Sequence, residues 1–204
     1  MIRNLSYWVQ FLFFTFYGLG FIPLTLFFSQ YSKFFYSYLY AVSIFFLTIL
    51  ASFYNGWKIS DLGLRRESWN NLLRSYGICL LVGIIFFGAY VFLFQMRLSF
   101  EPHQVIYGIF FSFFTSAIQE FAFRSYFLRL KLLLWNNKHL AVFINAFLFG
   151  LFHIVFGSIN DVLLAFFFAL ILNYIYLSYP HLFSCIIVHG VLNFLFCKAG
   201  FFAV

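Results

Sequence analysis

Charged side chains are scarce in this chain. They make up 8% of its 204 residues, with 12 Lys and Arg against 5 Asp and Glu, whereas about 25% is usual for a soluble globular domain. So few charges cannot cover the surface of a water-soluble fold. Because 65% of the residues are hydrophobic, the composition excludes an ordinary soluble protein and predicts one that lies in lipid.

Cysteine and proline are also rare, with 3 of each. Each cysteine lies inside an apolar run and none has a metal-type spacing, so we expect buried thiols at Cys79, Cys185 and Cys197. The last residues carry no cysteine at the prenylation position, so we expect no prenyl group on the chain itself. The apolar run from Trp8 is longer than a signal-peptide core and lacks a cleavage site, which predicts a retained anchor.

Long apolar runs dominate what is present. They are continuously apolar rather than alternating, which disfavours a β-barrel. At roughly 20 residues a span they would use about 140 residues and leave only short loops. The sequence therefore predicts an all-α, polytopic transmembrane bundle of about seven helices (six to eight), with residues 1–204 as a single integral membrane domain. The runs cover residues 8–29, 34–54, 77–95, 105–134, 139–157, 160–178 and 182–199.

The distribution of basic residues predicts the orientation. The net charge of +7 is carried in loops between apolar runs, which is the pattern of a membrane surface and not of a nucleic-acid partner. The N-terminus and the second, fourth and sixth loops collect eight basic residues, against three for the other loops. This bias places the N-terminus in the cytoplasm. The eight are Arg3, Lys58, Arg65, Arg66, Arg74, Arg129, Lys131 and Lys138, and the three are Lys33, Arg97 and Lys198.

Segment 57–75 mixes Trp and Leu with four basic residues. We interpret it as a cytoplasmic loop that sets the topology. An interfacial helix that binds anionic lipid is the alternative.

Ionisable groups within the runs are few, and in lipid such groups usually mark a site. Glu120 is the one acid well inside an apolar run, and Arg124 follows it at i+4 on the same helical face. His153 lies deep in the next run, and His189 and Asn193 share one face of the last. Because exposing any of these groups to lipid has a high free-energy cost, we expect them to line one interior cavity.

Depth along the helices is compatible with such a cavity. Glu120 and His153 each lie about 14 residues from the expected cytoplasmic ends of their helices, which is about 20 Å. His189 and Asn193 lie several ångströms closer to that end, a mismatch that helix tilt would have to absorb. A purely structural interpretation stays open, with a buried ion pair, a core histidine and interhelical hydrogen bonds. A proton pathway is a further alternative.

Three short motifs carry a family resemblance. The run Gln119–Arg124 (QEFAFR) resembles the E-E-x-x-x-R motif of the CAAX-protease and bacteriocin-processing family of intramembrane peptidases. The run Phe149–His153 is similar to its F-x-x-x-H motif, and His189–Asn193 is similar to its H-x-x-x-N motif. Their order, their spacing and the helices that hold them match over about residues 105–199, so the resemblance implies a polytopic helical membrane protein.

The resemblance implies peptide hydrolysis by an activated water, with no covalent intermediate and no cofactor. The first acid of the first motif, with His153, would activate the water, while His189 and Asn193 would stabilise the oxyanion. This sequence has Gln119 at that first position, and an amide can orient a water but cannot accept its proton.

Glu120 occupies the second acidic position. Arg124 would hold Glu120 ionised and occupied in an ion pair. Glu120 also lies about 100° around the helix from Gln119, so the two side chains need not face the same cavity. The water would then be activated by Glu120 or His153 with Gln119 as an orienting group, or the chain is not a hydrolase.

Two functions therefore stay open. The first is an intramembrane endopeptidase that cleaves a membrane-embedded or lipid-anchored peptide, using Gln119, Glu120, His153, His189 and Asn193, with Arg124 beside Glu120. The second is a catalytically silent relative that acts as an immunity factor or binds a hydrophobic peptide. A further alternative treats Glu120, His153 and His189 as zinc ligands, although no H-E-x-x-H motif supports it. The resemblance implies a bacterial cytoplasmic (inner) membrane, whereas substrate and oligomeric state stay undetermined.

Overall fold

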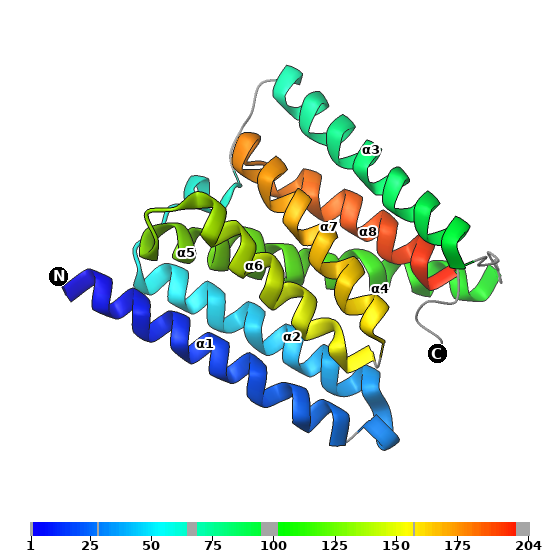
Figure 1. The fold of residues 1–204 in the computed structure, drawn as a ribbon, viewed down its shortest axis with the longest axis horizontal. Coiled ribbons are helices and arrows are strands. Elements are labelled where there is room, and N and C mark those ends of the chain that lie inside the picture. Colours follow the sequence, from blue (N-terminus) through cyan, green and yellow to red (C-terminus); the bar gives the residue numbers. More distant parts are fainter. Residues whose placement is uncertain (1, 28, 65–68, 95–101, 157, 199–204) are drawn as a thin grey trace.

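The structure is a computed structural model that describes residues 2–27, 29–64, 69–94, 102–156 and 158–198 (Figure 1). Every regular element in these ranges is a helix. The helices are α1 (Ile2–Phe27), α2 (Ser29–Tyr54), η1 (Ile59–Leu62), α3 (Trp69–Phe94), α4 (Pro102–Glu120), η2 (Phe121–Leu128), α5 (Arg129–Leu134), α6 (Lys138–Phe152), η3 (His153–Phe156), α7 (Ile159–Ser178) and α8 (Leu182–Lys198). Here η1 and η3 are single 3₁₀ turns, and η2 is a π-helix.

The predicted all-α fold is confirmed. The elements α4, η2 and α5 follow one another without a break, so each of the seven apolar runs lies mainly in one helix of the described chain. Four helical segments are long and apolar enough to cross a membrane by length and composition, and two others are apolar but shorter. The four are Leu5–Leu24, Trp69–Ala89, Lys138–Val155 and Ile159–Ser178, and the two are Leu39–Tyr54 and Leu182–Phe196.

Two helix boundaries differ from the prediction. α3 begins at Trp69, so part of the segment 57–75 that we interpret as a loop is helical. The rest of that segment contains the short turn η1, while residues 65–68 lie outside the described ones. α6 was expected to extend to residue 157 but ends at Phe152, where the backbone tightens into η3.

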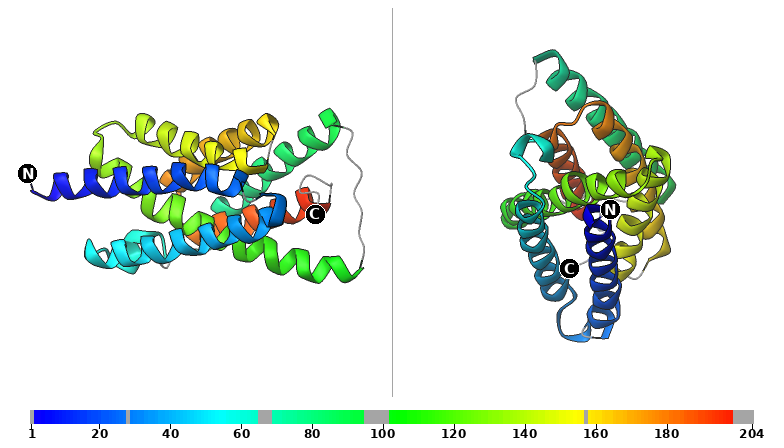
Figure 2. Two further views of the ribbon diagram at one scale, coloured as in Figure 1. Left: turned by 90° about the horizontal axis from the view of Figure 1, so that it is seen from below. Right: turned by 90° about the vertical axis from the view of Figure 1, so that its left-hand side faces the viewer.

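The helices pack in neighbouring pairs. α6 lies along α7, α4 lies along α8, and α1 lies beside α2, as Figures 1 and 2 show. α3 covers α8 at one edge of the bundle, while α1 and α2 form the opposite edge. The continuous helix from α4 to α5 runs between these edges, which places the first motif in the interior.

The outer surface of the bundle is apolar. Large hydrophobic side chains are widely exposed on several helices, including Phe16 (67%), Phe53 (76%) and Phe92 (82%). A monomeric soluble protein rarely exposes large contiguous apolar areas, whereas lipid tails solvate them. The described cysteines Cys79 and Cys185 are buried free thiols, as expected. The side chain of Cys197 lies outside the described ones.

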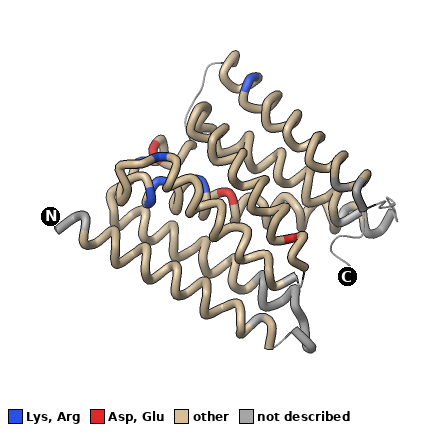
Figure 3. Tube along the Cα trace, viewed as in Figure 1, with Lys and Arg blue, Asp and Glu red and all other residues tan. Residues whose placement is uncertain are grey.

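Among the residues that Figure 3 describes, charged ones gather where η1, η2 and α5 meet, and most other parts of the helices carry none. Arg129 pairs with Asp61 of η1, with Nη2 3.5 Å from Oδ1. Buried Lys131 donates from Nζ to Oδ1 of Asn145 (3.1 Å), and Nδ2 of Asn145 donates to Oδ1 of Asn173 (3.1 Å). This chain of hydrogen bonds joins α5, α6 and α7 and satisfies polar groups that would be costly alone in an apolar interior.

Candidate active site

Glu120 lies at the junction of α4 and η2 with no exposed surface. Its Oε2 is 3.0 Å from Nε of Arg124, the expected i,i+4 partner, and its Oε1 is 2.6 Å from Nδ1 of His189 on α8. A carboxylate accepts hydrogen bonds, so Nδ1 of His189 donates. Both carboxylate oxygens are therefore engaged by neighbouring side chains.

The π-helix begins directly after Glu120, where a regular α-helix was expected. Its i→i+5 hydrogen bonding widens the turn, and such segments are frequent at functional sites. All eight side chains of η2 are buried. Arg124 therefore lies inside the bundle, where its guanidinium carbon is 4.7 Å from the centre of the Phe149 ring. The ring face and Glu120 together stabilise a cation that lipid would not solvate.

His153 ends α6 and begins η3. Its Nδ1 lies 2.8 Å from the carbonyl oxygen of Phe149. Because a carbonyl can only accept, Nδ1 carries the proton, so in the neutral ring Nε2 carries the lone pair. The backbone bond thus fixes the tautomer in which His153 can accept a proton at Nε2.

Asn193 lies one turn after His189 on α8, and its Nδ2 donates to Oγ of Ser116 on α4 (3.0 Å). Ser116 is fully buried, and the sequence analysis did not single it out. A signal was present, because Ser116 precedes Glu120 by four residues and shares its helical face. Two side-chain contacts, from Glu120 and from Ser116, therefore determine which face of α8 packs against α4.

Two glycines inside the motifs allow the helices to approach this closely. A Cβ built on Gly150 would lie 2.8 Å from the carbonyl oxygen of Val162 and from Cβ of Phe166, both on α7. A Cβ on Gly190 would lie 2.6 Å from the ring of Phe113 on α4. Gly150 thus lets α7 pack on the end of α6 beside His153, and Gly190 lets α8 pack on α4.

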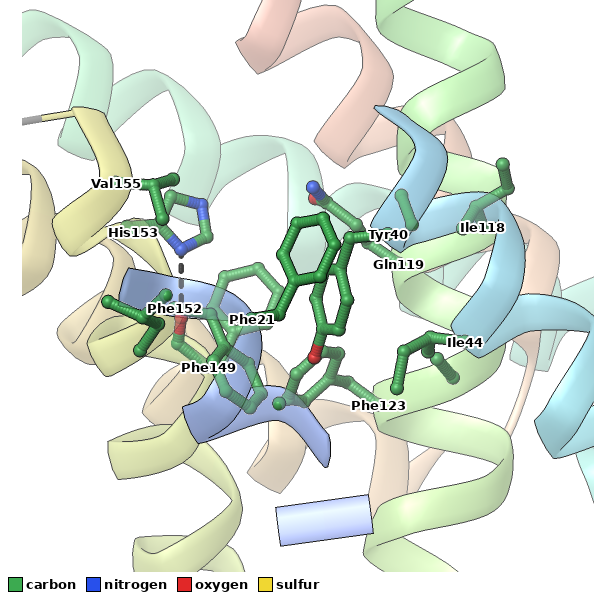
Figure 4. A pocket seen from close by; sticks show the side chains of 14 residues that line it. Phe21, Tyr40, Ile44, Ile118, Gln119, Phe123, Phe149, Phe152, His153 and Val155 are labelled. Carbon is green, nitrogen blue, oxygen red and sulfur yellow. Dashed lines mark hydrogen bonds between the residues drawn. The ribbon is translucent and has the colours of Figure 1, made fainter. Parts of the chain in front are cut away.

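A first cavity, of about 80 Å³, contains Gln119 and His153. Figure 4 shows the amide of Gln119 and the ring of His153 at its border, among side chains of α1 and α2 such as Phe21 and Tyr40. Oε1 of Gln119 is buried and has no hydrogen-bond partner among the described residues. An amide oxygen in this position can hold a water molecule, for which the cavity has room.

A second cavity, of about 40 Å³, is lined by His153, His189 and Asn193. It is also lined by Asp161, in the first turn of α7. The sequence alone does not point to Asp161, because an acid just after a helix start is usually explained by the helix dipole. Only the packing of α7 against α6 and α8 reveals that it faces the other polar groups.

The structure divides the expected residues between two cavities rather than placing them in one. His153 lines both, Gln119 lines the first, and His189 and Asn193 line the second. Glu120 lines neither, although its distance from the helix end predicted the same depth in the membrane as that of His153. The different faces of Gln119 and Glu120 agree with their rotation around the helix. The depth mismatch of α8 does not prevent contact, because His189 reaches Glu120 directly.

Within the described part of the chain, no group of three or more His, Cys, Asp and Glu side chains is arranged to hold a metal ion. Of the three residues in the zinc alternative, Glu120 and His189 bind each other directly.

A comparison with family models matches the segment that contains all three motifs. Residues 101–195 match the Rce1-like family of type II CAAX prenyl endopeptidases. The predicted family resemblance is thereby confirmed, and the Rce1-like segment extends from the start of α4 to α8. No curated protein and no solved structure matches the chain significantly. Together with the apolar helices, the match supports an integral membrane protein with a segment similar to CAAX prenyl endopeptidases.

Proposed function

We propose that the chain is an intramembrane endopeptidase that hydrolyses a peptide bond of a membrane-associated or lipid-modified substrate by an activated water. The observation that carries this proposal is the second cavity, where His153 of one motif meets His189 and Asn193 of another. A cavity of about 40 Å³ admits a water molecule. The match of residues 101–195 to prenyl endopeptidases indicates a lipid-modified peptide as the substrate class.

Each polar group has a role that fits its contacts. His153 presents Nε2 as an acceptor that polarises the water, because its Nδ1 donates to a backbone carbonyl. The amide of Asn193 and, in the imidazolium form, Nε2 of His189 can donate to the oxyanion that develops on the scissile carbonyl. Glu120 is the counter-charge for that imidazolium and orients its ring from the other side. Arg124 in turn holds Glu120.

A second function is favoured by one specific observation. Gln119 stands where the family's first acid is expected, and both oxygens of Glu120 are already engaged. A chain without a free carboxylate at this position would be a catalytically silent relative, acting as an immunity factor or binding a hydrophobic peptide without cleaving it.

The test is cleavage of membrane-anchored peptides by purified protein in proteoliposomes. We expect the unmodified protein to cleave a prenylated peptide faster than the same peptide without the lipid. H153A should reduce the rate by about 10²-fold or more. H139A is the matched control, because His139 is exposed and bonds to Tyr174 at the surface of the bundle, so its rate should be unchanged.

The outcomes separate the alternatives. Binding of the prenylated peptide without cleavage by the unmodified protein would favour the silent relative. Cleavage that survives H153A would contradict the proposed site. Loss of activity with a chelator and recovery with zinc would instead favour the zinc alternative.

A further inference from the structure

The proposed hydrolase lacks an acid at residue 119, so a carboxylate that acts on the water beside His153 would have to come from elsewhere in the chain. Among the residues that the structure describes, Asp161 is the only acid that lines either of the two cavities. It is 6% exposed, and no ion pair to it is found among these residues. Burying a carboxylate among apolar helices without a counter-charge is expensive, and such groups usually have a function.

The face of α7 that carries Asp161 points at the site. Leu164, Ala165 and Phe168 line the same cavity and lie three, four and seven residues after Asp161, which is the spacing of one helical face. Two turns along this face, the ring of Phe168 lies 5.4 Å from the ring of His189, between centroids. The orientation of Asp161 is therefore set by the packing of the whole helix.

The approach of α7 to His153 has its own structural cause. Gly150 has no side chain, and this lets the first turns of α7 pack directly on the last turn of α6. The carboxylate of Asp161 and the ring of His153 thus border one small space, although neither residue belongs to the other's helix.

We propose, resting on the function proposed above, that Asp161 is a catalytic carboxylate that takes the proton from the attacking water. As the water oxygen bonds to the carbonyl carbon of the peptide, one water proton moves to Asp161 and the carbonyl electrons move to the oxygen, which His189 and Asn193 stabilise. Collapse of this intermediate breaks the C–N bond, and the proton passes from Asp161 to the leaving nitrogen. The products are a carboxylic acid and an amine, and Asp161 is restored.

A purely structural role for Asp161 makes a different prediction. An acid in the first turn stabilises a helix through the dipole, which requires a carboxylate near the N-terminus but no particular face, and the Asp161 side chain also hydrogen-bonds to Ser158, the N-cap of α7. Asn160, the preceding residue, is exposed. The double variant N160D/D161N therefore keeps the net charge and the N-terminal carboxylate but moves it out of the cavity.

The experiment measures cleavage of the prenylated peptide in proteoliposomes together with thermal unfolding of each variant. D161N and N160D/D161N should each lose about 10²-fold or more of the rate, while N160D alone should keep it. N160D/D161N should stay folded at the assay temperature, because it keeps the N-terminal carboxylate and loses only the hydrogen bond to Ser158. In the D161N background, Q119E should restore part of the rate, because it places a carboxylate in the wall of the first cavity, which His153 also lines.

The results distinguish this inference from the function on which it rests. If the unmodified protein cleaves and H153A does not, full activity of N160D/D161N would overturn the role of Asp161 alone. If the unmodified protein cleaves no peptide, both proposals fail. Because the double variant keeps the stabilising charge, the test holds even where D161N by itself unfolds.

Discussion

The Nδ1 atom of His189 lies 2.6 Å from Oε1 of Glu120, although the two residues are 69 positions apart in the chain. This contact ties α8 to the junction of α4 and η2. Since Arg124 holds the other oxygen of Glu120, three charged or ionisable groups stabilise one another in the buried interior. The acid in the first motif thus anchors helices as well as orienting a histidine.

We expect the Glu120–Arg124 pair to contribute to the free energy of unfolding in detergent. E120Q leaves a buried guanidinium without its counter-charge, and R124Q leaves the carboxylate with His189 alone. Removing one member of a buried pair typically costs about 3–5 kcal/mol. In the double variant E120Q/R124Q neither charge remains, so its loss should be smaller than the sum of the two single losses. Strictly additive losses would show that the two groups do not stabilise each other.

Gly150 should be intolerant of even one added methyl group. In G150A the new Cβ would meet the backbone of Val162, so α6 and α7 must separate, at a cost of about 1–3 kcal/mol. The melting temperature in detergent should fall. The control is G88A on α3, where a Cβ would have nothing within 4 Å and where Ala is the better helix former. A melting temperature of G150A equal to that of G88A would contradict the close approach.

We expect Asn145 to stabilise the fold, because it accepts the hydrogen bond of the buried Lys131 on α5. N145A removes the acceptor of Lys131 and also the donor to Asn173. Each buried polar group left without a partner costs about 1–3 kcal/mol. Chemical denaturation should therefore show a large loss for N145A, whereas N160A, at an exposed position, should change stability by no more than about 0.5 kcal/mol. Equal stability of the two variants would mean that Lys131 has another acceptor.

The basic residues of the loops predict that η1 faces the cytoplasm. In a variant without the 3 native cysteines, S60C should react with a membrane-impermeant thiol reagent only from the cytoplasmic side. Ser60 is exposed in η1. N160C, in the first turn of α7, should react only from the other side. Labelling of S60C from the outer face would reverse the predicted orientation.

The sequence by itself determined the helical class and the position of the helices. A chain with 65% hydrophobic residues in long uninterrupted runs can satisfy its backbone in lipid only within helices. The Glu120–Arg124 pair was also predictable, because residues at i and i+4 are neighbours on any helix. The motifs of the Rce1-like segment were recognised from local spacing alone.

Only the tertiary structure decided which groups face one another. His189 could have faced any neighbour, and its pairing with Glu120 depends on the close packing of α8 on α4 at Gly190. The cavity position of Asp161 depends in the same way on the approach of α7 at Gly150. Helical periodicity sets which residues share a face, but the rotation of each helix about its axis follows from side-chain packing with its neighbours. That packing involves residues far apart in the chain, which no local pattern encodes.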